Sequence, residues 1–492
     1  MFDRLISYFA RQNPHALAIT TLAGHLTYAE FDANIDRMAA ALEEIDPPRP
    51  GLVAVVIGDQ YIHWLFLMAL ARLGVTTCSY LAVQRAQMEP LLKPDLIITD
   101  QPPQPDDETR PRIHRVTPEW LGEVGKRPVV HRPRIKVDPD SLARISTSSG
   151  TTGVPKKFGL SWAAVETRVL QVAAIANSTH PSEIRIQSLI GPEHLAYPGA
   201  GISAWGLGGT MIFGPNDPVS VANTLTRLKP TVLNMAPIQL KVLLDALPEG
   251  FLPLRDLSLT VSGSHTPRAV RELARMRLTN NLVLFYGTSE GGTIACRPDN
   301  SVRGDDADVG WVFPWTEVEI VDDDHNPLPY GSLGRVRARG TGFIDSYIDD
   351  DEANAAHFRD GWFYPGDVGS LTVDGHLRVE GRVDEVMNFG GSKFMPHVIE
   401  GAVMACAGVR DAGLFTMPDD AGFPRPWIAV VRGPDLREEE IAKALLIPGL
   451  PPVHVVWIDR VPRTPTGKVH RDQLQEAAKS LRDPSVAANG SA

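Results

Sequence analysis

Residues 27–73 change their apolar pattern twice, and this alternation limits the possible folds more than any other feature. Thr27 and Glu30 have the spacing of a capping box, and apolar residues follow them at helical spacing. Residues 52–57 are apolar without a break, as in a strand that is buried on both faces. Residues 61–73 return to a helical pattern. Alternating helices and buried strands predict an α/β fold with mostly parallel sheets and flanking helices.

The length of 492 residues predicts more than one domain, and the last hundred or so residues have a pattern of their own. Their apolar runs predict strands at residues 414–415, 427–431 and 453–458, and a helix at residues 437–446. This mixture is typical of a small α+β domain. We therefore expect a large N-terminal domain at residues 1–383 and a small C-terminal domain at residues 384–492.

Composition and charge argue against several classes of protein. The net charge of −11 opposes long-range attraction to a phosphate backbone, so we expect no nucleic acid partner. Cys78, Cys296 and Cys406 lack CxxC spacing, which argues against a disulfide framework or zinc site and fits a reducing, cytoplasmic location. The first residues do not have the pattern of a signal peptide. The most apolar later window, residues 61–75, is too short to span a bilayer, so we expect no membrane span.

The most specific segment is a Ser/Thr/Gly-rich stretch at residues 146–157, which follows a short strand pattern. Its glycines let backbone N–H groups converge on an anion, its hydroxyls add donors, and Lys156 adds a positive charge. This combination predicts a polyphosphate-binding loop, although it lacks the Gly-Lys-Ser/Thr ending of a Walker A loop. A plain surface turn is the alternative, which the ordered string disfavours. The candidate ligands are Ser148, Ser149, Gly150, Thr151, Thr152, Gly153 and Lys156.

A second polar cluster stands at the end of another strand pattern. Tyr286 offers a ring for stacking on adenine, and Glu290 offers the carboxylate that Mg²⁺ prefers beside phosphate oxygens. Residues suited to phosphate lie between them, at Gly287, Thr288 and Ser289. The same stretch matches the G-x-S-x-G elbow of serine hydrolases, with Ser289 as nucleophile. That elbow requires a helix directly afterwards, and the residues that follow have no helical pattern.

These segments resemble, in order and spacing, the adenylate-forming superfamily, which includes acyl- and aryl-CoA synthetases and the adenylation domains of nonribosomal peptide synthetases. The resemblance covers nearly the whole chain. Further motifs that carry it lie at residues 361–367, 381–384, 387–396 and 462–471. Two departures are Lys157, where the family usually has glycine, and Pro365, where it usually has threonine. The resemblance implies ATP, Mg²⁺ and coenzyme A as cofactors and a small carboxylic acid as substrate.

The resemblance also assigns roles at the nucleotide. Tyr286 would stack on adenine, Ser289 would contact the α-phosphate, and Glu290 would hold Mg²⁺. Asp367 would accept hydrogen bonds from both ribose hydroxyls, and Arg382 would assist it.

Further roles fall on the acid pocket. His194 would border the carboxylate, with a surface-loop histidine as the alternative. Ser264 and His265 stand where relatives have small residues, so they would narrow the pocket or recognise a polar acid.

In the C-terminal domain, the resemblance makes Lys468 the catalytic residue that bridges the carboxylate and the α-phosphate. Asp384 would be the hinge of a mobile domain. Gly390, Gly391 and Lys393 would lie in a loop that lines the tunnel for the thiol, although this loop also has the pattern of a hairpin turn.

The resemblance carried by these motifs implies an acid–CoA ligase that forms an acyl-adenylate, releases pyrophosphate and transfers the acyl group to coenzyme A. A stand-alone enzyme that loads a separate carrier protein is the alternative. Two hypotheses of another class are a serine hydrolase that uses Ser289 and an inactive binding protein. The sequence leaves open whether the acid is aryl, short-chain or long-chain, what His265 does, and whether the protein is a monomer or a homodimer.

Overall fold

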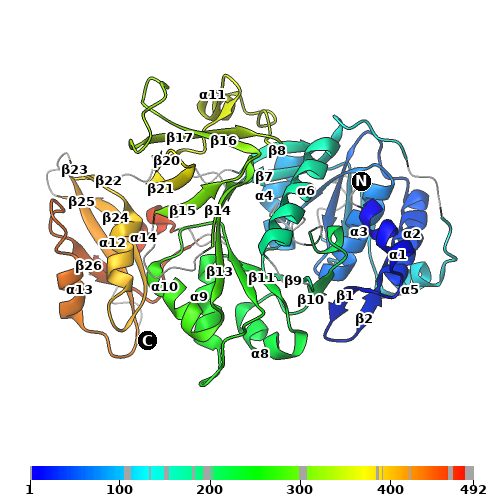
Figure 1. Ribbon diagram of the computed structural model, residues 1–492, viewed down its shortest axis with the longest axis horizontal. Coiled ribbons are helices and arrows are strands. Elements are labelled where there is room, and N and C mark those ends of the chain that lie inside the picture. Colours follow the sequence, from blue (N-terminus) through cyan, green and yellow to red (C-terminus); the bar gives the residue numbers. More distant parts are fainter. Residues whose placement is uncertain are drawn as a thin grey trace.

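The computed structural model describes residues 3–104, 112–131, 135–148, 155–179, 183–191, 201, 203–298, 307–383, 387–389, 392–419, 423–463 and 469–482. Within these ranges, the side chains of residues 176–179, 388, 392–393 and 481–482 are not described. Two large sheets with helices packed on them form most of the molecule, and a small C-terminal unit lies at one side (Figure 1). This arrangement confirms the predicted α/β fold class.

The smaller of the two main sheets has six strands. They are β3 (Leu52–Val56), β4 (Thr76–Ser79), β5 (Leu96–Thr99), β6 (Arg112–Arg115), β7 (Leu142–Ser148) and β8 (Lys156–Ser161). Their order is β6-β5-β3-β4-β7-β8, and every pairing is parallel except that of β7 with the edge strand β8. β3 is buried at every position, as its apolar run predicts.

The larger sheet has fifteen strands, and its first half is parallel. The parallel strands are β1 (Leu17–Thr21), β9 (Arg185–Ser188), β10 (Thr210–Phe213), β11 (Val232–Met235), β12 (Ser258–Val261) and β13 (Asn281–Thr288). They lie in the order β1-β10-β9-β11-β12-β13, and the short strand β2 (His25–Thr27) pairs antiparallel with β1 at the edge. This half has the sheet type that the sequence predicts.

After β13 every pairing in the larger sheet is antiparallel. The strands are β14 (Gly292–Pro298), β15 (Asp308–Val312), β16 (Thr316–Val321), β17 (Gly334–Gly340), β18 (Phe358–Arg359), β19 (Trp362–Phe363), β20 (Asp367–Leu371) and β21 (His376–Arg382). The alternation of helix and strand near the N-terminus gives no hint of this half. It matters for the site because it carries Asp367 and Arg382, the residues of the predicted ribose motif.

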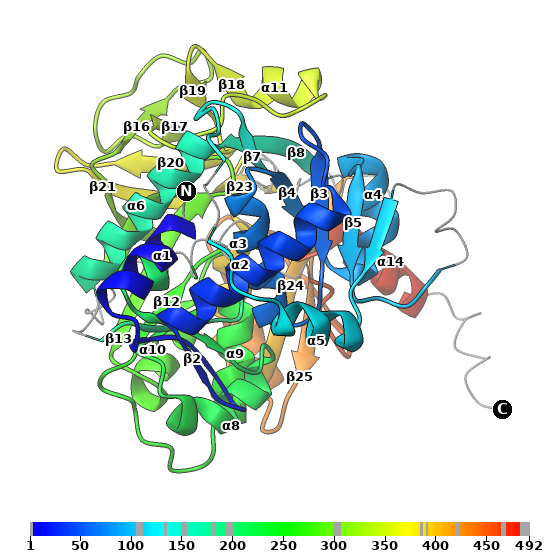
Figure 2. The ribbon, with the colours of Figure 1, turned by 90° about the vertical axis from the view of Figure 1, so that its right-hand side faces the viewer.

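Helices flank and separate the two sheets. α2 (Tyr28–Ile45) begins at the predicted capping box, in which Thr27 N–H donates to Glu30 and Glu30 N–H donates to the Thr27 hydroxyl. Figure 2 shows α1 (Asp3–Gln12), α2 and α3 (Gln60–Arg72) beside one another, with β3, β4 and β5 next to them. α6 (Trp162–Thr179) follows β8 directly and was not predicted. The others are α4 (Arg85–Leu92), α5 (Pro118–Lys126), α8 (Pro218–Leu228), α9 (Pro237–Ala246), α10 (Arg268–Arg277) and α11 (Asp351–His357).

A dense aromatic core packs α2 and α3 against Trp205, whose Nε1 donates to the carbonyl oxygen of Ala18 in β1 of the larger sheet over 2.9 Å. The ring of Trp205 lies 5.0 Å, between centroids, from both Phe31 and Trp64, and all three side chains are buried. Edge-on and tilted contacts of this kind add to the free energy gained from burying the rings. In the described ranges, no helix has the combined length and apolarity that crossing a membrane requires.

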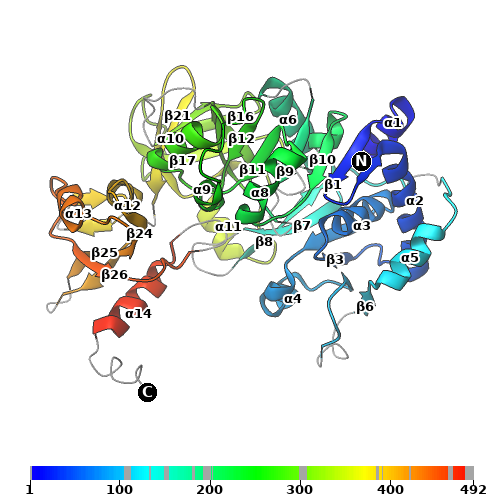
Figure 3. The same ribbon diagram turned by 90° about the horizontal axis from the view of Figure 1, so that it is seen from below.

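The C-terminal unit combines a small sheet with three helices. Its elements are β22 (Met387–Phe389), β23 (Ser392–Phe394), α12 (Pro396–Met404), β24 (Val409–Pro418), β25 (Pro424–Arg432), α13 (Glu438–Ala444), β26 (His454–Trp457) and α14 (Arg471–Arg482). Its two hydrophobic clusters contain only residues from Met387 onward. Figure 3 shows this unit beside the two main sheets. The strands and the helix predicted for this unit are present. β22 and β23 pair as a hairpin, which was the alternative interpretation of the motif at residues 387–396.

Candidate active site

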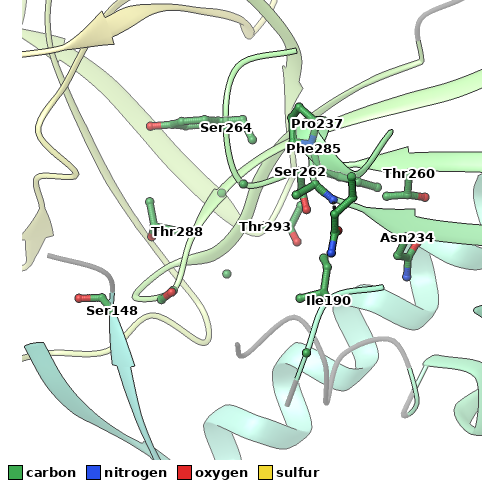
Figure 4. A pocket seen from close by; sticks show the side chains of 18 of the residues that line it. Ser148, Ile190, Asn234, Pro237, Thr260, Ser262, Ser264, Phe285, Thr288 and Thr293 are labelled. Atoms are coloured by element: carbon green, nitrogen blue, oxygen red, sulfur yellow. Dashed lines mark hydrogen bonds between the residues drawn. The ribbon is translucent and has the colours of Figure 1, made fainter. Parts of the chain in front are cut away.

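A cavity of about 890 Å³ lies where both main sheets, α6 and the C-terminal unit meet. Open α/β sheets bind ligands at the carboxyl ends of their parallel strands, and several lining residues occupy such positions. Figure 4 shows Ser148, the last residue of β7, and Thr288, the last of β13, at one end. Asn234 and Thr260 lie at the other end (Figure 4). We call these the Ser148 end and the Asn234 end.

The hairpin of β13 and β14 carries Glu290 at the Ser148 end. Gly287 has no room for a side chain, because a Cβ atom there would lie 2.3 Å from the carbonyl oxygen of Gly292. The buried Glu290 carboxylate accepts a hydrogen bond of 2.7 Å from the Tyr347 hydroxyl. The turn leads into β14 and not into a helix, so this hairpin is not the nucleophile elbow that a Ser289 hydrolase requires.

Tyr286, Asp367 and Arg382 meet beside this hairpin. The Tyr286 hydroxyl donates to a carboxylate oxygen of Asp367 over 2.5 Å, and Arg382 Nη1 lies 3.6 Å from the other oxygen. Burial, together with the neighbouring Asp367 carboxylate, raises the pKa of Tyr286 well above 10, so its hydroxyl stays a proton donor at neutral pH. The structure thus brings these three residues together, and their contacts with adenine and ribose stay predictions.

Lys156, at the start of β8, lies against His357 of α11. Lys156 Nζ is 2.7 Å from His357 Nε2, and His357 Nδ1 is 2.8 Å from the carbonyl oxygen of Tyr364. Burial and the nearby ammonium lower the pKa of His357 from its ordinary value of 6.5. The neutral ring therefore donates from Nδ1 and accepts from Lys156 at Nε2. Lys156 Nζ also lies 5.3 Å from the ring centre of Tyr347.

The loop after β12 carries Ser264 and His265 and lines the same cavity. Gly263 before them has φ of +101°, a conformation that side chains larger than hydrogen rarely adopt. The ring of His265 lies 4.9 Å, between centroids, from the ring of His397 in α12. His265 therefore stands at a contact between the larger sheet and the C-terminal unit, which no sequence pattern indicates.

The Asn234 end is lined by polar side chains that the sequence analysis missed. Asn234 and Thr260 are direct neighbours on β11 and β12, Ser262 follows β12, and Thr293 lies on β14. Among the described residues, none of these four side chains has a hydrogen-bond partner. Apolar surface surrounds them, from Ile190, Pro237 and Phe285 (Figure 4). Within the described part of the chain, this end of the cavity thus has hydrogen-bonding groups without partners.

Three further residues near the Ser148 end were also missed. Tyr347, His357 and Arg168 belong to no recognisable motif, and the fold alone brings them to the site. The helix that carries Arg168 was not predicted, so no signal pointed to it.

Several predicted site residues lie outside the described residues, so their roles stay predictions. These are Ser149, Gly150, Thr151, Thr152, Gly153, His194, Asp384, Gly390, Gly391 and Lys468. Lys393 is described only by its backbone, in β23.

Comparisons with known proteins show which family and fold this chain resembles. The family model described as "AMP-binding enzyme" matches residues 6–348. A pseudomonine synthase of Pseudomonas entomophila is 26% identical over 499 aligned positions, which cover 94% of this chain and 80% of the synthase. An indoleacetate–CoA ligase of Aromatoleum aromaticum is 27% identical over 362 positions, which cover 69% of this chain and 68% of the ligase.

A solved structure has the same fold over nearly the full length. The o-succinylbenzoate–CoA synthetase of Bacillus subtilis, in complex with ATP and a magnesium ion, superposes with a TM-score of 0.78 at 20% identity. The match covers 96% of this chain and 99% of the synthetase.

Proposed function

Because the chain belongs to the AMP-binding family of adenylate-forming enzymes, we propose that it activates a small carboxylic acid with ATP and transfers the acyl group to coenzyme A. In the first step a carboxylate oxygen attacks the α-phosphorus of ATP, the bond to the β-phosphate breaks, and pyrophosphate leaves. In the second step the thiolate sulfur attacks the carbonyl carbon of the acyl-adenylate, and AMP leaves.

One observation carries this proposal: a single cavity has paired side chains that suit a nucleotide at one end and, among the described residues, unpaired polar side chains at the other. Asp367 with Arg382 suits a ribose, and Ser148 with Lys156 suits phosphate. The Asn234 end leaves room for an acid. Binding both substrates in one cavity allows the attacking oxygen and the phosphorus to be held in line, which replaces a bimolecular encounter.

Glu290 fits the magnesium ion that the proposed reaction uses. Its carboxylate is buried at the cavity wall, and the Tyr347 hydroxyl that donates to it also interacts with the side chain of Ser148, at the strand end that leads into the predicted phosphate loop. Mg²⁺ is held in proteins by one or two carboxylates together with phosphate oxygens of the substrate. When bound, the ion would offset the negative charge of the two reacting anions.

The Asn234 end favours an acid that carries a hydrogen-bonding group besides its carboxylate. An unsubstituted chain would bury the polar atoms of Asn234 and Thr260 without partners, at a cost of roughly 1–3 kcal/mol for each group. A hydroxyl, keto or amide group on the acid would pair with them. We therefore place polar-substituted acids ahead of simple fatty acids.

The C-terminal unit would move between the two steps. We propose that residues 384–492 rotate about Asp384, which brings Lys468 in for adenylation and the loop with Gly391 in for thiol transfer. The separate hydrophobic clusters of this unit support such a motion. Lys468→Ala should abolish adenylation but spare thioester formation from supplied acyl-adenylate. Equal loss of both half-reactions would contradict the motion.

The decisive experiment is acid-dependent ATP–pyrophosphate exchange over a panel of aryl, short-chain and long-chain acids, each with and without a polar substituent. We expect exchange with at least one acid and AMP as a product. Mass spectrometry after addition of coenzyme A should then detect the acyl-CoA. If adenylate forms but coenzyme A remains unmodified, a separate carrier protein becomes the acceptor. Failure of every acid to support exchange would refute the proposed function.

A further inference from the structure

Arg168 connects three segments of the chain that meet at the Ser148 end. Its Nη1 donates to the carbonyl oxygen of Ser289 over 3.0 Å, and its Nη2 to that of Glu290 over 2.6 Å. Its Nε donates to the carbonyl oxygen of Gly342 over 2.8 Å. One guanidinium thus fixes the backbone of the Glu290 turn and the segment after β17 to helix α6.

The second segment leads directly to the partner of the Glu290 carboxylate. The N–H of Ile344 donates to the Glu290 carbonyl oxygen over 3.1 Å, and Tyr347, three residues later, donates its hydroxyl to the carboxylate. A Cβ atom at Gly291 would lie 2.6 Å from the ring of Phe343, so the two segments are in close contact. Arg168 therefore holds both members of the Tyr347–Glu290 pair.

Only arginine can make this set of bonds. Its planar guanidinium presents N–H donors on three nitrogens in a fixed geometry, whereas a lysine ammonium is a single point with rotating donors. Burial lowers the pKa of Arg168 to about 10, and the nearby Glu290 opposes that shift. Since the pKa stays above neutrality, Arg168 keeps all its N–H donors at pH 7.

Helix α6 also connects Arg168 to Lys156, one of the predicted phosphate-binding residues. α6 begins immediately after β8, the strand that starts with Lys156. A displacement of α6 would therefore act on β8 with Lys156 and on the Glu290 turn together.

We propose that Arg168 is a positioning residue: it sets the place of the Glu290 carboxylate relative to the phosphate side, and so determines how strongly Mg²⁺ promotes ATP binding. This inference rests on the proposed nucleotide site and goes beyond it, because Arg168 touches neither nucleotide nor metal in the proposed arrangement. Removing groups that orient a metal ligand typically costs about 10–100-fold in affinity or activity.

The test compares Arg168→Gln and Arg168→Lys with a matched control, Gln171→Ala. Gln171 lies one turn further along α6 and donates to the carbonyl oxygen and hydroxyl of Thr341, over 2.9 and 3.1 Å. It therefore ties the same helix to the same segment without contacting the Glu290 turn. ATP binding is measured by calorimetry with and without Mg²⁺, and the unfolding temperature of each variant is recorded.

We expect Mg²⁺ to increase the ATP affinity of the wild type, and both Arg168 variants to lose about tenfold or more of that increase. Affinity for ATP without Mg²⁺ should change far less, and Gln171→Ala should resemble the wild type. If Arg168 only stabilised the fold, its variants would instead have a lower unfolding temperature and a lower ATP affinity both with and without Mg²⁺. Gln171→Ala would then show the same changes. That pattern, or a wild-type Mg²⁺ effect in Arg168→Gln, would overturn the inference.

A double-mutant cycle with Glu290→Gln gives a second measurement. If Arg168 acts through Glu290, adding Arg168→Gln to Glu290→Gln should change the Mg²⁺ effect little further. Additive losses would refute positioning. The proposed function fails separately: a wild type that binds ATP with Mg²⁺ but adenylates no acid would refute the acid activation alone.

Discussion

The two ends of the cavity differ in how their polar groups are used. At the Ser148 end the key side chains are already paired, Tyr286 with Asp367, Tyr347 with Glu290 and Lys156 with His357. At the Asn234 end, four polar side chains have no partner among the described residues. The Ser148 end is therefore preorganised, whereas the polar groups of the Asn234 end are available to pair with a ligand.

This difference indicates which end selects the substrate. Side chains held by other side chains keep their geometry whatever is bound, which suits a nucleotide that is the same in every reaction cycle. Unpaired groups discriminate, because a ligand that pairs them is favoured and one that leaves them buried and unpaired is rejected. The preorganised end should therefore determine rate, and the unpaired end should determine acid preference.

The largest effect should come from Glu290→Gln. The amide oxygen can still accept the Tyr347 hydrogen bond, so the fold and the unfolding temperature should be kept. Loss of the charge should lower acid-dependent ATP–pyrophosphate exchange on the order of 100-fold or more. Exchange near the wild-type rate would show that the Ser148 end does not determine the rate.

Tyr347→Phe removes one hydroxyl and leaves the ring that Lys156 faces. Without its donor, the Glu290 carboxylate can turn away, and we expect about a tenfold loss of exchange rate. Titration with ATP at saturating acid checks this. An unchanged rate would mean that preorganisation of Glu290 does not need this hydrogen bond.

Asn234→Leu and Thr260→Val should alter the preference between acids more than the reaction rate. We measure preference as the ratio of kcat/KM for a polar acid to kcat/KM for its unsubstituted analogue. This ratio should fall about tenfold in either variant. The KM for ATP should not change. A change in the KM for ATP with constant acid preference would reverse the roles that we give to the two ends.

The smallest effect should be the contribution of His357 to the pH dependence of the free energy of unfolding. Its pKa is lowered in the folded protein, so the unfolded chain binds the proton more readily. Its contribution to stability should therefore be full above about pH 6.5 and decline as the pH falls below that value. Urea unfolding at pH 7.5 and 5.5 should show a larger decrease for the wild type than for His357→Asn. Equal decreases would show that the Lys156–His357 pair is not coupled to folding.

The sequence indicated those parts of the fold and site that depend on local pattern. The capping box at Thr27 and the buried run of β3 are encoded by neighbouring residues, and both are present. Tyr286, Asp367 and Arg382 stand in compact motifs, and the structure brings them together.

Other parts depend on contacts between distant segments and have no local signal. Arg168 reaches the Glu290 turn across more than a hundred residues of chain, and a lone arginine on a helix is usually a solvated charge. Asn234 and Thr260 become neighbours only when β11 and β12 pair. The antiparallel half of the larger sheet was missed for a related reason: among the described residues, only α11 intervenes between its strands, so it lacks the regular helix–strand alternation that revealed the parallel half.

The tight packing at Gly287 has a consequence for how such an enzyme diversifies. No residue with a side chain fits there without moving the β13–β14 hairpin, so that part of the molecule tolerates almost no substitution. Among the described residues, no hydrogen bond uses the side chains of Asn234 and Thr260, so exchanging them leaves the hydrogen bonds of that part of the chain intact. Under the proposed function, homologues could therefore come to accept other acids by changing two strand positions, while the residues proposed to bind the nucleotide stay the same.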